Sequence, residues 1–186
     1  MARTLSADRA ARILRGIRSQ EGTSVRLRRR LASEVLRDLR TLDRKIADLN
    51  GRIEAEVESS GTALTQIFGI GPILAARIIG TVGDVTRFPT KAHFASYSGT
   101  APVEAPSGEV VRHRLSLAGN RKLNYALHMV ALCQARSDAR GGAYYRKKIE
   151  EGKSRKEALR CLKRRVSDAV FRSLMADSQA PSRSAA

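Results

Sequence analysis

The chain has 186 residues, of which 42% are hydrophobic, and it carries 35 Lys and Arg against 18 Asp and Glu. Its net charge of +17 and isoelectric point near 11.1 exceed what solubility requires, and such an excess is typical of proteins that bind a polyanion. The sequence contains no secretory signal and no apolar run long enough to span a membrane. We therefore expect nucleic acid as the partner and no membrane partner.

The positive charge is concentrated in the C-terminal third. Residues 111–172 contain 17 Lys and Arg against five Asp and Glu, whereas residues 1–60 interleave 14 basic residues with nine acids. An interleaved pattern is typical of a solvated surface, but a local excess of twelve positive charges favours a surface that contacts phosphates. Residues 111–172 are therefore the predicted nucleic-acid-binding region.

The two cysteines, Cys133 and Cys161, lie in segments with apolar periodicity. They form no Cys-x-x-Cys pair, and only three histidines are scattered along the chain. We therefore expect no metal site in this chain and two buried free thiols.

Residues 3–20 predict a short amphipathic helix, within an N-terminal segment 1–22, and residues 23–60 predict one long helix. Apolar residues of the long helix recur at the a/d spacing of a coiled coil: Val35, Leu39, Leu42, Ile46, Leu49 and Ile53. So short a seam can also pack inside its own chain as a helical hairpin. Pairing with another protomer is the preferred interpretation, which predicts a homo-oligomer formed through residues 31–57.

A helix-hairpin-helix is predicted around Gly69-Ile70-Gly71, where two short apolar helices meet. Gly69 and Gly71 suit a tight hairpin, because glycine accepts positive φ and close backbone approach. Amide groups at the start of the next helix, where Pro72 stands, are then available to hold a DNA phosphate. The alternative is an ordinary helical hairpin without a ligand. The net charge favours contact with DNA.

Thr90 is the predicted cap of a short helix through Ala95, which Gly99 closes. The following stretch is punctuated by Pro and Gly and contains the β-branched pair Val110-Val111 after a Ser-Gly turn. This pattern predicts a small irregular β-hairpin.

Helical periodicity returns after Asn120, the predicted N-cap of the next helix, with Arg121 and Lys122 in its first turn; all three are candidate nucleic-acid contacts. Cations at a helix N-terminus oppose the helix dipole, so their presence is reasonable where a polyanion supplies the counter-charge. Two more helices are predicted, separated at residues 151–153, and residues 177–186 are an expected disordered tail. Further phosphate contacts are expected from the last helix, through Lys163, Arg164 and Arg165.

Ser107 is the candidate nucleophile. It lies in Pro106-Ser107-Gly108, and the guanidinium groups of Arg112 and Arg114 follow closely, where they can orient a phosphate. The alternative is an ordinary turn, because Pro-Ser-Gly is a common turn sequence. The acidic residues do not cluster, so the sequence shows no complete two-metal site. Three tyrosines are rival candidates for the nucleophile: Tyr97, Tyr144 and Tyr145. The alternative for each is a role in the core or in stacking.

The order of these motifs resembles the C-terminal domain of bacterial insertion-sequence transposases of the DEDD/serine type, the relatives of the Piv site-specific invertases. The resemblance covers about residues 62–175, and the preceding long helix looks like the coiled-coil segment of that family. It implies a mainly α fold, with a long coiled-coil helix before a helical domain, 61–176, that contains a helix-hairpin-helix and a small irregular β-hairpin. Four blocks carry it: Gly69-Ile70-Gly71, Gly99-Thr100-Ala101-Pro102, Ser107-Gly108 and Gly119-Asn120-Arg121-Lys122-Leu123.

The resemblance implies that Ser107 attacks a DNA phosphodiester and becomes joined to the strand. It also implies an oligomer, DNA and a guide RNA as partners, and a location in the bacterial cytoplasm at the nucleoid. Family members carry an N-terminal resolvase-like domain whose acids bind Mg²⁺, and this chain begins directly in the segment after it. We therefore expect no cofactor bound by this chain itself, and Mg²⁺ only with the absent acidic domain.

The function predicted from the sequence is DNA transposition or site-specific recombination, as a DNA-binding serine domain that needs an acidic metal-binding domain in trans. A non-catalytic nucleic-acid-binding module, using the helix-hairpin-helix and the basic helices, is the alternative. A third reading is a coiled-coil adaptor whose basic charge is incidental.

Overall fold

The computed structural model describes residues 6–16, 22–107, 110–114 and 119–180, with the backbone alone described for 103–107 and 110–114. Over these residues the chain is mainly helical, as the sequence predicts. Its internal contacts divide it into two compact units, Met1–Arg52 and Ile53–Ala186. The division falls inside the long helix.

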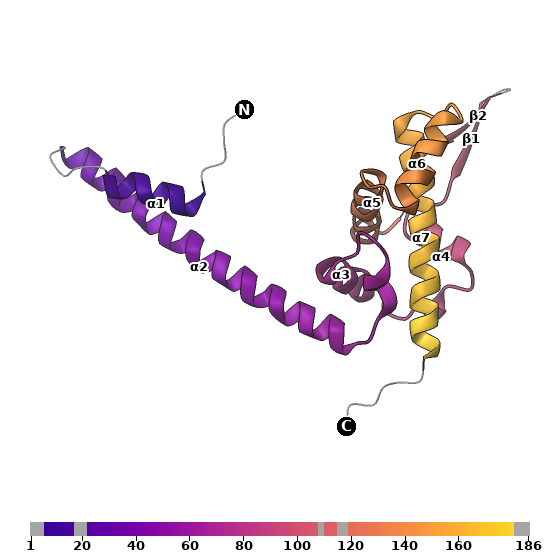
Figure 1. Ribbon diagram of the computed structural model, residues 1–186, viewed down its shortest axis with the longest axis horizontal. Coiled ribbons are helices and arrows are strands. Elements are labelled where there is room, and N and C mark those ends of the chain that lie inside the picture. Colours follow the sequence, from indigo (N-terminus) through magenta and orange to yellow (C-terminus); the bar gives the residue numbers. More distant parts are fainter. Residues whose placement is uncertain (1–5, 17–21, 108–109, 115–118, 181–186) are drawn as a thin grey trace. The chain divides into compact units, whose positions relative to one another are not determined.

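The first unit contains α1 (Ala7–Gly16) and most of α2 (Thr23–Ser59), both drawn in indigo to purple in Figure 1. α1 lies within the predicted helix 3–20, of which residues 3–5 and 17–20 lie outside the described residues, and the predicted helix 23–60 is confirmed almost to the residue. Ala11 is buried, and Nη2 of Arg40 donates to Oδ1 of Asp8 over 3.1 Å. These contacts hold α1 against α2.

The apolar seam of α2 is exposed along most of its length. Its side chains in the first unit remain between 42% and 66% exposed: Val35, Leu39, Leu42, Ile46 and Leu49. The sixth seam residue, Ile53, belongs to the second unit, where it packs at the margin of the core, and Val57 is buried there. The described part of the chain therefore leaves the central seam without the cover that a helical hairpin would give it.

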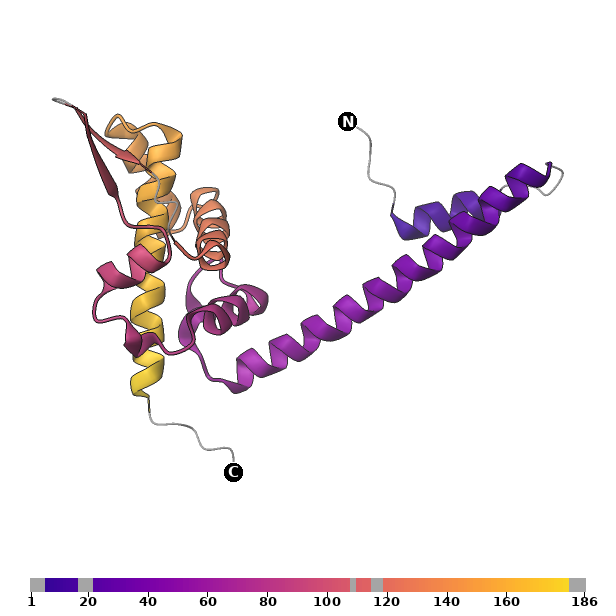
Figure 2. The same cartoon turned by 180° about the vertical axis from the view of Figure 1, so that it is seen from behind.

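The second unit is a helical domain with one two-stranded sheet, and Figure 2 shows its elements from behind. The strands β1 (Val103–Ser107) and β2 (Val110–Arg114) pair antiparallel, with Ser107 opposite Val110 and Val103 opposite Arg114. Two 3-10 helices lie at Ala63–Gln66 and Val85–Arg87. The α-helices are α3 (Pro72–Val82), α4 (Lys91–Tyr97), α5 (Arg121–Ala135), α6 (Arg140–Glu150) and α7 (Arg155–Gln179).

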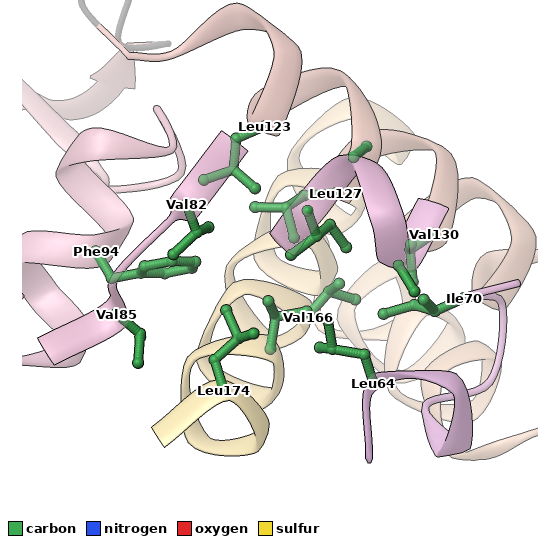
Figure 3. Close-up of a cluster of buried hydrophobic side chains, with 14 of the residues drawn as sticks. Leu64, Ile70, Val82, Val85, Phe94, Leu123, Leu127, Val130, Val166 and Leu174 are labelled. Atoms are coloured by element: carbon green, nitrogen blue, oxygen red, sulfur yellow. The ribbon is translucent and has the colours of Figure 1, made fainter. Parts of the chain in front are cut away.

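The core of the second unit forms around α7, which packs against α4, α5, α6 and both 3-10 helices. Figure 3 shows apolar side chains from these elements meeting in one cluster, among them Leu64, Phe94 and Val166. Phe94 and Leu64 are fully buried, and each such side chain contributes about 1.5–3 kcal/mol relative to an exposed one. The core fixes the helices that carry the predicted site residues.

Polar caps set the starts of the helices in this unit. Oγ1 of Thr90 accepts a hydrogen bond from the backbone N–H of His93 at the start of α4, which confirms the predicted cap. Ser154 and Glu157 form a reciprocal capping box at the start of α7. This box was not part of the sequence prediction, although Ser-x-x-Glu is its usual signature.

The predicted helix-hairpin-helix region begins with a single 3-10 turn, Ala63–Gln66, followed by α3. Gly69 has φ +90°, and a β-carbon there would lie 3.3 Å from Cβ of Cys133 on α5. Gly71 is the N-cap of α3, with Pro72 in its first turn. Gly69 therefore serves both the turn and a close approach to α5, and Gly71 starts the second helix.

Two details of the sequence prediction are wrong. The tail was expected from residue 177, but α7 continues to Gln179, and Asp177 accepts hydrogen bonds from Thr62 Oγ1 (2.6 Å) and Ala63 N (3.1 Å). This contact across the unit keeps the last turn of α7 helical; residues 181–186 lie outside the described residues. Cys133 is exposed and Cys161 is half-buried, although both were expected to be buried; Gly69 beside Cys133 has no side chain to cover its thiol.

Candidate nucleic-acid interface

Two glycines that touch flank the pair of strands, one before β1 and one after β2. Gly99 closes α4 with φ +65°, and Gly119 packs directly on its backbone: a β-carbon at 119 would collide with the Gly99 nitrogen and Cα. No side chain other than hydrogen fits at 119 without displacing backbone. We call Gly99, Gly119, Asn120 and Asn124 the hairpin base, because together they join the two ends of segment 100–118.

Asn120 holds the second end of that segment. Its Oδ1 accepts from the backbone N–H groups of Lys122 (3.0 Å) and Leu123 (3.1 Å), which confirms it as the N-cap of α5. Its Nδ2 donates to the Tyr97 hydroxyl over 3.0 Å, and its backbone N–H donates to the Tyr97 carbonyl over 2.7 Å. Both polar side-chain atoms of Asn120 are thus engaged within the chain, and its predicted contact with nucleic acid stays a prediction.

Asn124, which the sequence prediction missed, connects the hairpin base to α7. Its Nδ2 donates to the carbonyl oxygens of Ser98 (2.8 Å) and Gly99 (3.1 Å), and its Oδ1 accepts from Nζ of Lys163 over 2.9 Å. The position gives no sequence signal of its own, because a single Asn in a helix is unremarkable and its partners lie far away along the chain.

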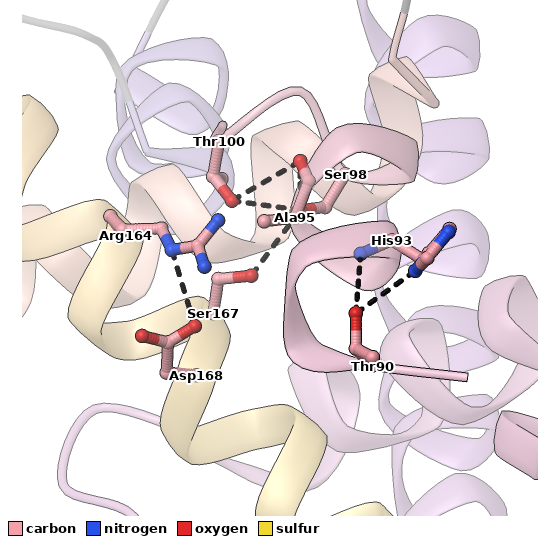
Figure 4. Close-up of polar contacts among 8 residues, drawn as sticks. All are labelled: Thr90, His93, Ala95, Ser98, Thr100, Arg164, Ser167 and Asp168. Atoms are coloured by element: carbon pink, nitrogen blue, oxygen red, sulfur yellow. Dashed lines mark hydrogen bonds and ion pairs between the residues drawn. The ribbon is translucent and has the colours of Figure 1, made fainter. Parts of the chain in front are cut away.

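Buried hydroxyl groups fasten the other side of the hairpin base to α7, as Figure 4 shows. Ser98 Oγ lies 3.0 Å from Thr100 Oγ1 and 3.3 Å from Ser167 Oγ, and it donates to the Ala95 carbonyl. Ser98 and Ser167 are fully buried, so these bonds are made away from water, where losing a partner costs most. The start of the hairpin is therefore fixed to the core through side chains from two helices.

The register of the strands places the candidate residues of the hairpin. Ser107 ends β1 opposite Val110, Arg112 lies opposite Ala105, and Arg114 lies opposite Val103. Successive positions of a strand alternate between faces and directly opposed positions share one, so positions 107, 112 and 114 fall on one face. The side chains of these three residues lie outside the described residues.

The predicted basic residues divide into two groups. Arg121 and Lys122 are exposed in the first turn of α5. Lys163, Arg164 and Arg165 line one cavity together with Gly99–Pro102, immediately before β1. The structure thus brings the Lys-Arg-Arg run next to the hairpin base, whereas Gly69 lies elsewhere, against α5.

Each residue of the Lys-Arg-Arg run has a different environment. Lys163 is 6% exposed, and burial lowers the pKa of its ammonium group. Nε of Arg164 lies 3.2 Å from Oδ1 of Asp168, and the Arg165 guanidinium stacks 4.4 Å from the Tyr144 ring centre. Burial of His128, and secondarily the charge of Lys163, lowers the pKa of that imidazole.

The rival nucleophiles have structural contacts. The Tyr97 hydroxyl accepts from Asn120 and donates to the Thr81 carbonyl, and Tyr144 lies under Arg165. Tyr145 packs beside the core. Among the residues whose side chains are described, no group of three or more His, Cys, Asp and Glu is placed to hold a metal ion. No described helix is long and apolar enough to cross a membrane.

Residues 61–146, which contain the hairpin base, match the family described as Transposase IS116/IS110/IS902 family. The chain is 36% identical over 126 residues to the uncharacterized 43.6 kDa protein of insertion element IS110 from Streptomyces coelicolor, covering 67% of this chain and 31% of that protein. It is 28% identical over 145 residues to the uncharacterized 44.8 kDa protein of insertion element IS116 from Streptomyces clavuligerus, covering 76% of this chain and 36% of that protein.

A pilin gene-inverting protein from Moraxella bovis is 28% identical over 123 residues, which cover 63% of this chain and 38% of the relative. The matched region thus spans only about a third of the length of each of these relatives. The comparisons support the resemblance to insertion-sequence transposases, with the hairpin base inside the region that matches their family.

Proposed function

We propose that this chain acts in DNA transposition or site-specific recombination, as the DNA-binding serine domain of an insertion-sequence transposase. The similarity of residues 61–146 to the transposase family and the insertion-element and gene-inverting relatives support this proposal. The observation that carries it is the hairpin base. Its contacts hold both ends of the segment that contains Ser107 against a rigid helical core.

In the proposed reaction, Oγ of Ser107 attacks a phosphorus atom of the DNA backbone. A serine–phosphate bond forms, the bond from phosphorus to the leaving strand breaks, and the serine proton passes to a general base. The leaving oxygen takes up a proton and ends as a hydroxyl group. Arg112 and Arg114, at positions on the same hairpin face, stabilise the phosphate charge. A separate acidic domain supplies the Mg²⁺ site and the base.

DNA is held in this proposal by the basic residues around the hairpin base and by the N-terminus of α3. Exposed Arg121 and Lys122 and the cavity-lining residues Lys163, Arg164 and Arg165 contact phosphates. The first turn of α3, after its N-cap Gly71, offers backbone N–H groups, and Gly69 forms the preceding turn. A guide RNA selects the target, which is consistent with contacts that read phosphates rather than bases.

The proposal includes a homo-oligomer that pairs the exposed seam of α2 between residues 31 and 57. Leu42 and Ile46 are each 55% exposed at successive seam positions, and a heptad seam buries such residues against a second helix. Light scattering should show a dimer or a larger assembly for the intact chain and a monomer for Leu42→Lys/Ile46→Lys. Thr41→Lys/Lys45→Gln, off the seam, should leave the assembly intact; a monomeric parent chain would contradict the pairing.

The chemical step is tested with a suicide DNA duplex that carries an element end, Mg²⁺, the acidic domain and the element's transcribed RNA. A denaturing gel should show a covalent protein–DNA band that Ser107→Ala abolishes. Ser96→Ala, at an exposed position of α4, is the control and should leave the band unchanged. A band that persists in Ser107→Ala would show that another residue is the nucleophile.

A non-catalytic nucleic-acid-binding module is the second candidate, favoured by the cluster of cations beside the hairpin base. It predicts no covalent band but a binding constant that falls steeply with salt, with a log–log slope of about 0.9 per neutralised duplex phosphate. A binding constant that does not change with salt would exclude nucleic acid as the partner and favour the coiled-coil adaptor.

A further inference from the structure

A cavity of about 320 Å³ opens between α6, α7 and the residues that precede β1. Its wall includes Gly99, Thr100 and Pro102, so it adjoins the hairpin base directly. Figures 1 and 2 both show the strands leaving the helical body beside α6, at this end of α7. A molecule in this cavity would therefore stand next to the start of the hairpin.

The cavity wall is strongly positive. Among its described residues are five cations and a single carboxylate, Glu157, which is engaged as the capping partner of Ser154. Asp168 neutralises Arg164 from outside the wall. Within the described side chains, three wall cations have no carboxylate within 4 Å: Lys153, Lys163 and Arg165.

Lys163 is the least expected of these cations. It is 6% exposed, and a buried ammonium group is costly unless it is paired with an anion or fully hydrogen-bonded. Of the groups described, only Oδ1 of Asn124 accepts from its Nζ, although an ammonium group carries three donors. A charge that is buried at a cavity wall with spare donors is arranged for an anionic ligand.

We propose that this cavity binds one backbone phosphate of a nucleic-acid strand, with Lys163 as its central contact and Lys153, Arg160 and Arg165 around it. This inference rests on the proposed function and adds a specific phosphate-binding site, called the phosphate seat below, to it. The bound phosphate supplies the counter-charge that the buried ammonium lacks, while Asn124 orients Nζ from the opposite side. A strand seated there is positioned at the first residues of the hairpin.

Cys161 offers a direct test, because this free thiol lines the cavity, whereas the second thiol, Cys133, is exposed on α5 and does not. The chain is treated with N-ethylmaleimide, with and without a single-stranded DNA oligonucleotide, and modification of each thiol is followed by peptide mass spectrometry. We expect DNA to slow modification of Cys161 at least fivefold, whereas Cys133, which lies beside Gly69, reports separately on contact at the start of α3. Equal rates of Cys161 modification without nucleic acid, with bound DNA and with a bound RNA of the same sequence would overturn the proposal.

The second test uses affinity. Lys163→Met removes the charge but nearly keeps the side-chain volume, so the core should tolerate it. Lys156→Met is the matched control, because Lys156 is exposed on the same helix and does not line the cavity. Fluorescence anisotropy should show at least a fivefold weaker affinity for Lys163→Met than for Lys156→Met. Equal effects of the two substitutions would show that Lys163 has no special contact.

RNA and DNA both carry the phosphate, and matched oligonucleotides of the same sequence distinguish them. Protection of Cys161 by the RNA alone assigns the seat to a guide strand, and protection by DNA alone assigns it to the recombining strand. Failure of the proposed function gives a different result. In that case the chain binds DNA and protects Cys161, but no covalent band forms.

Discussion

Gly119 lies so close to Gly99 that the backbone of one residue occupies the space where a side chain of the other would begin. The two glycines are twenty positions apart in the sequence and belong to the two motifs that bracket the strands. Their contact, together with the hydrogen bonds of Asn120 and Asn124, makes the hairpin base a rigid support rather than a pair of loops.

Gly119→Ala should destabilise the second unit by about 1–3 kcal/mol, because the added methyl group forces backbone apart in a packed region. Gly80→Ala is the control. Gly80 lies in α3 with open space around it, so alanine there should stabilise the chain by up to about 1 kcal/mol. Urea unfolding followed by circular dichroism measures both, and a neutral Gly119→Ala would disprove the close contact.

Asn124→Ala removes two donor contacts to the backbone and leaves the buried Nζ of Lys163 without its acceptor. We expect a loss of about 1–3 kcal/mol in the free energy of unfolding. Adding Lys163→Met should restore part of that loss, since the unpaired charge is then gone. A double-mutant cycle reports the coupling, and strict additivity would mean that the two side chains do not interact.

Asp177→Asn tests the last turn of α7. The carboxylate accepts from Thr62 and Ala63, and hydrogen bonds to charged acceptors contribute about 1.5–3 kcal/mol when well formed. We expect a lower midpoint of urea unfolding for this variant. Asp138→Asn removes a fully exposed carboxylate that pairs with half-exposed Arg146, and it should change the midpoint little.

His128 should make stability depend on pH. Its pKa is lowered in the folded chain, mainly by burial, so the unfolded chain takes up a proton first as the pH falls below the ordinary value of 6.5. The unfolded state then binds more protons, and stability decreases between pH 7 and pH 5. His128→Gln should show a smaller decrease than the parent chain.

The sequence predicted the elements well where the signal is local. Thr90 and Asn120 were predicted as caps because a capping side chain acts within three residues of its own position, and both are confirmed. The long helix followed from its heptad repeat. The end of α7 was missed because the contact of Asp177 with Thr62 spans 115 residues, which no local pattern encodes.

The site was predicted only in part, for a geometric reason. Lys163, Arg164 and Arg165 were predicted as one set of phosphate contacts, and all three line one cavity. Their environments differ, because successive helix residues point about 100° apart, and Lys163 is the buried one. Asn124 was missed altogether, because its role depends on partners from α4 and α7 that the fold alone brings together.

In the paired strands β1 and β2, the number of residues before Ser107 decides on which face of the hairpin the serine lies. Because side chains alternate along a strand, inserting one residue between the Gly99 end and Ser107 moves the serine to the opposite face, and inserting two returns it. Working relatives should therefore differ in this strand by even numbers of residues.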